Sequence, residues 1–143
     1  MSDHHYTLME IAHAHSSMSL DPSTKVGAVI TSDRRIVACG YNHIPDRIPH
    51  TQEMLNDRSW KYPRIIHAEQ HALSQIGFHQ LRHPVIYVTH YPCERCAAQI
   101  IHSGICEVFT HSVPLELMER WPGMKIAAEM FLEAKIPVTF IEF

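Results

Sequence analysis

Hydrophobic and polar residues follow one another in segments that switch between helical and extended spacing. Near the N-terminus, apolar residues recur at helical spacing over residues 6–17, which predicts a first helix. Two short apolar runs, residues 26–30 and 36–40, flank the polar turn 32–35, and this pattern predicts a β-hairpin. Residues 42–64 are rich in proline and polar groups, and we expect a long loop of the kind that often carries function.

Beyond residue 66, segments with strand-like composition alternate with segments of helical spacing. This alternation is typical of an α/β sheet with parallel strand pairs. The sequence shows neither an internal repeat nor a linker, so residues 1–143 are interpreted as a single domain. Helices are predicted at residues 67–75, 93–102, 114–120 and 125–134, and strands at residues 85–89, 105–110 and 136–142.

The composition is that of an ordinary globular domain, and it narrows the range of partners. Of the 143 residues, 45% are hydrophobic and 19% are charged, and the formal net charge is -3. Proteins that wrap RNA or duplex DNA usually carry a basic surplus, so the charge argues against a nucleic-acid partner. The sequence contains no apolar run long enough for a membrane span and no signal-peptide core. The expected location is therefore cytoplasmic, with no membrane partner.

Four cysteines are present, and two of them, Cys93 and Cys96, form a Cys-x-x-Cys pair. Cys39 and Cys106 lie in apolar stretches and are expected to be buried free thiols. One metal site in a reducing compartment fits this count better than a disulfide framework. The chain also has 13 histidines, and those at positions 4–5 are expected in a mobile N-terminus.

The most informative segments are His67-Ala-Glu69 and Pro92-Cys-Glu-Arg-Cys96, separated by one predicted helix and one predicted strand. Each is weak alone, because a Cys-x-x-Cys pair occurs in redox dithiols and in structural zinc sites. In this order, they match the zinc nucleobase deaminase signature, H-x-E followed by P-C-x-x-C. A structural zinc site, a redox dithiol and an inactive member that keeps its zinc remain the alternatives.

The chemistry of a catalytic zinc explains this spacing. Cys93 and Cys96 are i and i+3 at a helix start, where the helix dipole favours thiolates. His67 opens another helix, and three protein ligands leave the fourth tetrahedral position for water. Glu69 is then available to move protons from the water to the ring nitrogen and to the leaving ammonia.

From about residue 16 to the C-terminus, the chain resembles the cytidine deaminase superfamily, most closely its deoxycytidylate (dCMP) deaminase branch. The resemblance implies a three-layer α/β fold with a mixed five-stranded sheet and helices on both faces. It also implies one Zn²⁺ per chain, hydrolytic deamination of dCMP to dUMP and ammonia, and a homo-oligomer, either a dimer or a hexamer. The segments that carry it are Asp21–Ile30, Gly40–His43, His67–Glu69, Tyr87–Ala97 and Ile100–Ile105.

The resemblance further implies contacts to the substrate. Asn42 matches an asparagine that contacts the sugar or phosphate, and Ala68 would hold the base through its backbone N–H. Tyr91 would lie against the pyrimidine ring, with a core position as the alternative. For Lys25, a solvent-exposed charge without a ligand is as plausible as a substrate contact. The loop that approaches the nucleotide phosphate in family members corresponds here to Ser23, Thr24 and Lys25.

Several positions leave questions open. His43 stands where the family usually has glycine, in a loop that regulated members use to bind dCTP and dTTP. His71 stands where the family commonly has asparagine, and either a packing role or a ligand contact is possible. Arg58, Lys61 and Arg64 are interpreted as a solvated face rather than a phosphate site. A second, structural zinc, as some members carry, would have to be held by Cys39, His43, His50 and His90.

Other substrates are weighed against dCMP. The tRNA adenosine deaminases usually have asparagine before His-Ala-Glu and a basic C-terminal helix. Here Ile66 precedes His67, and the helical segment 127–135 is acidic on balance. A nucleoside or free-base deaminase and a catalytically silent nucleotide-binding member remain open alternatives.

Overall fold

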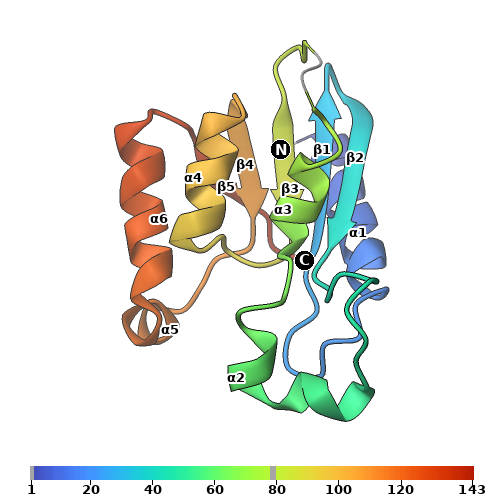
Figure 1. Ribbon diagram of the computed structural model, residues 1–143. Coiled ribbons are helices and arrows are strands. Elements are labelled where there is room, and N and C mark those ends of the chain that lie inside the picture. Colours follow the sequence, from blue (N-terminus) through green and yellow to red (C-terminus); the bar gives the residue numbers. More distant parts are fainter. Residues whose placement is uncertain (1, 78–79) are drawn as a thin grey trace.

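A mixed five-stranded sheet forms the middle layer of the molecule (Figure 1). In the computed structural model, which describes residues 2–77 and 80–143, the strand order is β2-β1-β3-β4-β5. Strand β1 is antiparallel to β2 and β3, whereas β4 is parallel to β3 and β5. The predicted mixed sheet is thus confirmed. The strands are β1 (Gly27–Ser32), β2 (Arg35–Tyr41), β3 (Val85–Val88), β4 (Glu107–Thr110) and β5 (Val138–Phe140).

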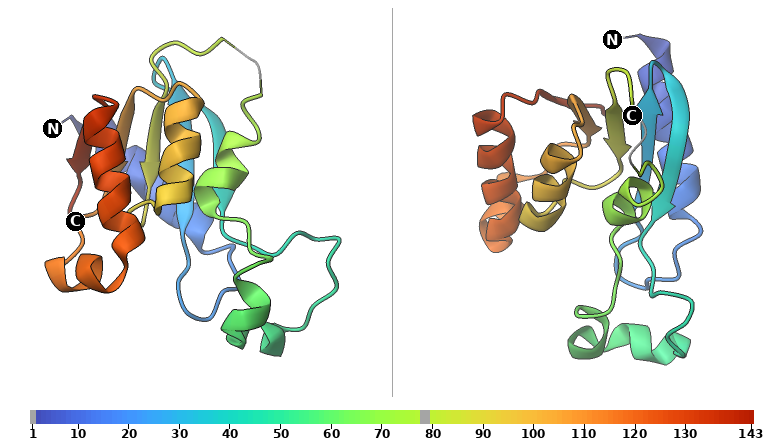
Figure 2. Two further views of the ribbon diagram at one scale, coloured as in Figure 1. Left: turned by 60° about the vertical axis from the view of Figure 1, so that its left-hand side comes forward. Right: turned by 45° about the horizontal axis from the view of Figure 1, so that its top comes forward.

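Helices cover both faces of this sheet, as expected for a three-layer fold (Figure 2). Helix α1 packs on one face, against β1, β2 and β3. Helices α3, α4 and α6 lie on the other face, where α3 contacts β1 and β2 and α4 lies between α3 and α6. The helices are α1 (Asp3–Ser16), the 3-10 helix η1 (Gln52–Asn56), α2 (Arg58–Lys61), α3 (Ala68–Leu73), α4 (Glu94–His102), α5 (Leu115–Arg120) and α6 (Pro122–Glu133).

Two cores result from the alternation of side chains along the strands. In β1, Ala28 and Ile30 point to the face that carries α3 and α4 and join the larger core. Val29 points to the opposite face, where it packs with Met9 and Ala12 of α1. All five side chains are fully buried. The hairpin β1–β2 is therefore shared by both cores and connects the helix layers.

Helix α1 begins earlier than the sequence pattern predicts, at Asp3 rather than at residue 6. The prediction of a mobile terminus at positions 4–5 is wrong, because His5 is helical and anchored to the sheet. Its Nδ1 lies 2.7 Å from the Tyr87 hydroxyl, and its ring stacks on Phe109 with centroids 4.3 Å apart. Of the predicted domain 1–143, positions 1, 78 and 79 lie outside the described residues.

The predicted long loop after β2 folds into a small lobe that contains η1 and α2 (Figure 1). The side chain of Asp57 caps α2 by accepting hydrogen bonds from two backbone N–H groups of the helix. At its base the lobe is closed by two hydrogen bonds between His43 and Ile66, His43 N to Ile66 O at 3.0 Å and Ile66 N to His43 O at 2.8 Å. These bonds fix the backbone immediately before His67.

The two cysteines outside the Cys-x-x-Cys pair are less buried than predicted. Cys106 is exposed and Cys39 is half-buried, and both are free thiols. Cys106 lies just before β4, where its side chain points away from the core that its apolar neighbours fill. In the part of the chain that the structure describes, no helix combines the length and apolar character needed to cross a bilayer.

Candidate metal centre

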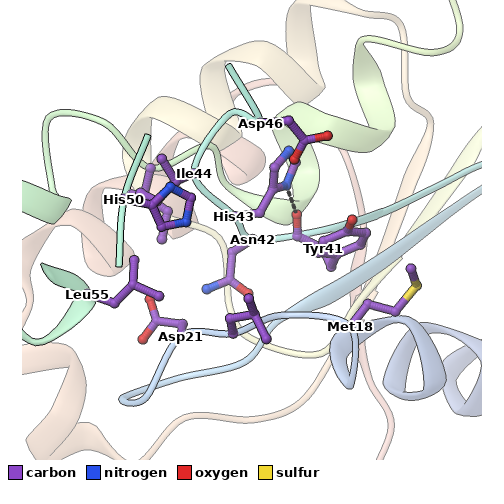
Figure 3. Close-up of a pocket in the computed structure, with 11 residues that line it drawn as sticks. Met18, Asp21, Tyr41, Asn42, His43, Ile44, Asp46, His50 and Leu55 are labelled. Atoms are coloured by element: carbon purple, nitrogen blue, oxygen red, sulfur yellow. Dashed lines mark hydrogen bonds between the residues drawn. The ribbon is translucent and has the colours of Figure 1, made fainter. Parts of the chain in front are cut away.

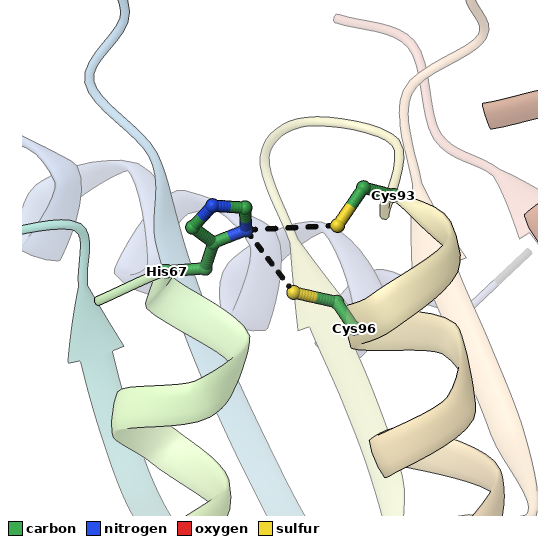
Figure 4. Close-up of side chains that lie close together, drawn as sticks. All are labelled: His67, Cys93 and Cys96. Carbon is green, nitrogen blue, oxygen red and sulfur yellow. Dashed lines mark hydrogen bonds between the residues drawn. The ribbon is translucent and has the colours of Figure 1, made fainter. Parts of the chain in front are cut away.

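Three metal-binding side chains converge at the starts of two neighbouring helices (Figure 4). His67 directly precedes α3, Cys93 directly precedes α4, and Cys96 lies in the first turn of α4. The Nδ1 atom of His67 is 3.2 Å from Cys96 Sγ and 3.7 Å from Cys93 Sγ. Within the described ranges, no other group of three histidine, cysteine or acidic side chains comes this close together.

The distances and the donor types fit a tetrahedral zinc ion. Zn–S bonds of about 2.3 Å and Zn–N bonds of about 2.0–2.1 Å at tetrahedral angles require an N···S separation of about 3.6 Å. The two observed separations, 3.2 and 3.7 Å, lie on either side of this value. Two sulfurs and one imidazole nitrogen are zinc-preferring donors, and three ligands leave one position open, as in catalytic zinc sites.

The electrostatics of the cluster also favour a cation. The hydrogen bond from Cys96 lowers the pKa of Cys93 to about 3, with a further contribution from the hydrogen bond to His67. The same hydrogen bond to Cys93, together with burial, raises the pKa of Cys96. Ionisation of Cys93 is therefore favoured, at a helix start where the dipole favours negative charge. A coordinated divalent ion would deprotonate the second thiol as well.

Glu69 lies beside these ligands in the first turn of α3 and is only 4% exposed. Burial raises the pKa of its carboxyl group, and the neighbouring His67 opposes this shift in part. A buried carboxyl group with a raised pKa holds a proton more readily than an exposed one, which suits a general acid–base group. Its location therefore suits a group that transfers protons next to the open ligand position.

The other predicted substrate residues lie at the start of α3, in the larger core and on the loop before β1. Ala68 is fully buried at the first position of α3. Tyr91 is 5% exposed and belongs to the larger core, with its ring centroid 6.3 Å from that of Phe140. Burial also raises the pKa of Tyr91. The loop before β1 has three exposed residues of this set, Ser23, Thr24 and Lys25.

Asn42 is buried and uses both ends of its amide on that loop. Its Oδ1 accepts a hydrogen bond from the backbone N–H of Val26 at 2.8 Å. Its Nδ2 donates to the backbone oxygen of Thr24 at 2.9 Å. The asparagine that the family resemblance marks for substrate contact therefore holds the backbone of the loop that contains Lys25.

The structure corrects one expectation about the basic residues and bears on one open question about metal-binding residues. Arg58 and Arg64 are exposed as predicted, but Lys61 is only 4% exposed and pairs with Asp21. A charge pattern alone does not reveal the buried partner, which lies forty positions earlier. A second zinc would need Cys39, His43, His50 and His90. In the part of the chain that the structure describes, these four side chains do not form a metal-binding cluster.

His71 has a packing role. Its Nδ1 accepts a hydrogen bond from the backbone N–H of Tyr41 at 3.2 Å. Its ring contacts the His43 ring edge-on, with centroids 4.6 Å apart. Both contacts join α3 to the end of β2, so the first of the two interpretations of this residue is supported.

A pocket of about 150 Å³ lies between the end of α1 and the lobe that follows β2 (Figure 3). Asp21, Asn42 and His43 line it together with apolar residues such as Leu55. None of the three metal-binding side chains lines this pocket, and neither does Glu69. We therefore do not assign the chemical step to it.

An open metal position beside a buried proton carrier is what hydrolysis of an exocyclic amino group requires. The fold and the site thus define a zinc-dependent hydrolytic deaminase. The sequence profile of the cytidine and deoxycytidylate deaminase zinc-binding region matches residues 2–112. The chain belongs to this family.

Individual relatives agree with the family assignment. A protein of Aliivibrio fischeri described as an uncharacterized deaminase in the luxG 3' region is 36% identical over 133 residues, 92% of this chain and 89% of that protein. The deoxycytidylate deaminase of Homo sapiens is 35% identical over 106 residues, which cover 70% of this chain and 60% of the human protein. This chain therefore matches less than two thirds of the human enzyme.

Solved structures share the fold. The dCMP deaminase of the cyanophage S-TIM5, solved in complex with dCMP and dUMP, superposes with a TM-score of 0.78 over 99% of both chains. Its sequence identity to this chain is 20%. At this identity the similarity establishes the three-layer fold alone.

Proposed function

We propose that this protein hydrolyses dCMP to dUMP and ammonia. The observation that carries the chemistry is the convergence of His67 Nδ1 with the sulfurs of Cys93 and Cys96 beside the buried Glu69. The choice of substrate is supported by relatives named deoxycytidylate deaminase and by the phage enzyme that was solved with dCMP and dUMP.

In this proposal, His67, Cys93 and Cys96 would hold one zinc ion, which would lower the pKa of a bound water molecule to about 7. Glu69 accepts a proton from the attacking water and delivers it to N3 of the cytosine ring. It then transfers the remaining hydroxyl proton to the amino group on C4. The C4–N bond breaks, ammonia leaves, and the C4 carbonyl of dUMP forms.

The remaining residues bind the nucleotide. The backbone N–H of Ala68 holds the base, and the ring of Tyr91 lies against the pyrimidine. Asn42 contacts the sugar or phosphate and fixes the neighbouring loop through its two backbone hydrogen bonds. The phosphate is bound by hydroxyl and ammonium groups on that loop. These groups belong to the exposed residues Ser23, Thr24 and Lys25.

Residues 1–143 act as one domain in this proposal, and the protein is a cytoplasmic homo-oligomer, either a dimer or a hexamer. The assembly is carried over from the resemblance to the deaminase family. The net charge of -3 agrees with a small nucleotide as partner rather than a nucleic acid. Analytical ultracentrifugation of the zinc-loaded protein gives the number of copies, and a monomer would contradict the assembly.

Ammonia release by the purified, zinc-loaded protein tests the substrate. We would offer dCMP, deoxycytidine, CMP, cytosine and a tRNA anticodon stem-loop in parallel. The proposal expects the highest kcat/KM for dCMP. A higher kcat/KM on any of the other compounds would overturn the choice of substrate and leave the zinc chemistry intact. Inertness on all five would favour a catalytically silent nucleotide-binding protein.

A further inference from the structure

Lys61 is an unusual lysine, because its side chain is almost completely removed from solvent. Lys61 is 4% exposed and Asp21, its partner, is 6% exposed. The Nζ atom lies 3.1 Å from each of the two carboxylate oxygens of Asp21. A buried ion pair is not by itself a good source of stability, since the loss of hydration offsets much of the attraction. A role beyond stability is therefore worth testing.

The position of Asp21 suggests that role. Its Oδ1 also accepts hydrogen bonds from the backbone N–H of Ser23 at 2.8 Å and of Thr24 at 3.2 Å. The carboxylate therefore binds Lys61 through both oxygens and shapes the turn of the loop through Oδ1. The side chains of Ser23 and Thr24 stay exposed while their backbone is held in place.

The ion pair connects two segments that are far apart in the sequence. Asp21 begins the loop before β1, whereas Lys61 ends α2 in the lobe between β2 and α3. A second contact between the same segments runs from Gln52 Nε2 to the backbone oxygen of Leu20 at 2.8 Å. The lobe thus serves as a support for the loop.

The backbone that leads to the metal centre is held by hydrogen bonds that do not involve the side chains of this pair. The backbone before His67 is fixed by the hydrogen bonds between His43 and Ile66. Loss of the ion pair should therefore move the loop while the metal ligands keep their places. An effect on the loop can therefore be measured separately from an effect on the metal ligands.

We propose that Lys61 and Asp21 are positioning residues that hold the Ser23–Lys25 loop in the shape that binds the substrate phosphate. This inference rests on the proposed function of the loop. Without the pair, the loop would sample other conformations, and the phosphate would lose preorganised hydrogen-bond donors. The binding of the base and the zinc would be unaffected, so only the affinity for the phosphate would fall.

Steady-state kinetics on dCMP and deoxycytidine, which differ only in the phosphate, test this inference. For Lys61→Met we expect a rise of about tenfold or more in KM for dCMP, with kcat and zinc content unchanged. The kcat/KM for deoxycytidine should stay within about twofold of the parent value. Calorimetric titration with dUMP should show a matching loss of affinity. Arg58→Met, which removes an exposed positive charge from the same helix, serves as the control and should leave both substrates unaffected.

The double variant Asp21→Asn/Lys61→Met separates positioning from stability. It removes both charges, so it avoids the unpaired buried carboxylate that destabilises Lys61→Met. We expect its thermal midpoint to recover toward the parent value while its preference for dCMP over deoxycytidine stays low. A preference that recovers together with stability, or that Lys61→Met never loses, would overturn the positioning role. A parent protein with no preference for dCMP would instead refute the phosphate-binding function on which the inference rests.

Discussion

Gly40 allows α3 to approach the sheet closely, and replacing it with alanine should displace the helix that begins at the metal ligand. A Cβ atom at this position would lie 2.5 Å from the backbone oxygen of Ala68 and 2.7 Å from the backbone nitrogen of Ala72. Since non-bonded atoms pack best at about 3.5 Å, the helix has to move by about 1 Å. Both contacts are to backbone, so no side chain can rotate away.

The displacement affects stability and catalysis to different extents. Overpacking of this kind typically costs about 1–3 kcal/mol of unfolding free energy. A misplacement of about 1 Å in an active site can lower the rate about 100-fold, because the reacting groups lose their alignment. We therefore expect Gly40→Ala to remain folded at 25 °C, a temperature well below unfolding for a typical domain, and to lose most of its kcat.

The assay measures kcat for dCMP, zinc content and the urea midpoint on the same preparation. Cys39→Ala is the control, because Cys39 neighbours Gly40 on β2 but packs with the core on the opposite face. It should keep its kcat while losing some stability. A folded, zinc-loaded Gly40→Ala protein with a kcat within about twofold of the parent would refute the reasoning that α3 needs this close approach.

Three further predictions concern the metal centre and the N-terminal helix. Glu69→Gln should keep one zinc per chain by elemental analysis and lose a factor of about 100 or more in kcat, as removal of a general acid–base group does; near-normal turnover would contradict the proton-transfer role. Cys93→Ala should lose zinc and show a lower urea midpoint, because metal binding contributes to folding; full zinc content would remove Cys93 from the ligand set. Burial and the neighbouring His4 lower the pKa of His5, so the folded state binds fewer protons than the unfolded chain, and stability should fall as the pH drops below about 6.5. Thermal melts at several pH values should show a flatter profile for His5→Gln, and an unchanged slope would exclude this histidine as a contributor.

The metal centre could be predicted from the sequence because each half of it is a short local motif. Two cysteines three positions apart at a helix start share one face, and His67 and Glu69 are separated by a single residue. The fold could be predicted through the alternation of strands and helices and through the family resemblance. The sequence patterns behind both predictions lie within one helix or strand, or between helices and strands that are neighbours along the chain.

The lobe after β2 could not be predicted in the same way. Helices η1 and α2 have five and four residues, too few for a hydrophobic period to be recognised. The burial of Lys61 depends on Asp21, forty positions away, and sequence composition favours exposure for lysine. Long-range pairing of polar groups leaves no periodic pattern along the chain.

The order of strands in the sheet also constrains when the metal can act during folding. Strands β2 and β3 lie on opposite sides of β1, so β3 has to join the β1–β2 hairpin at its other edge. The hairpin is a local structure, whereas the pairing of β1 with β3 joins residues more than fifty positions apart and is intrinsically slower. We expect His67 to meet the two cysteines only after this pairing, and an interaction formed after the folding transition state mainly slows unfolding. Zinc would thus extend the lifetime of the native state while leaving the rate of folding nearly unchanged.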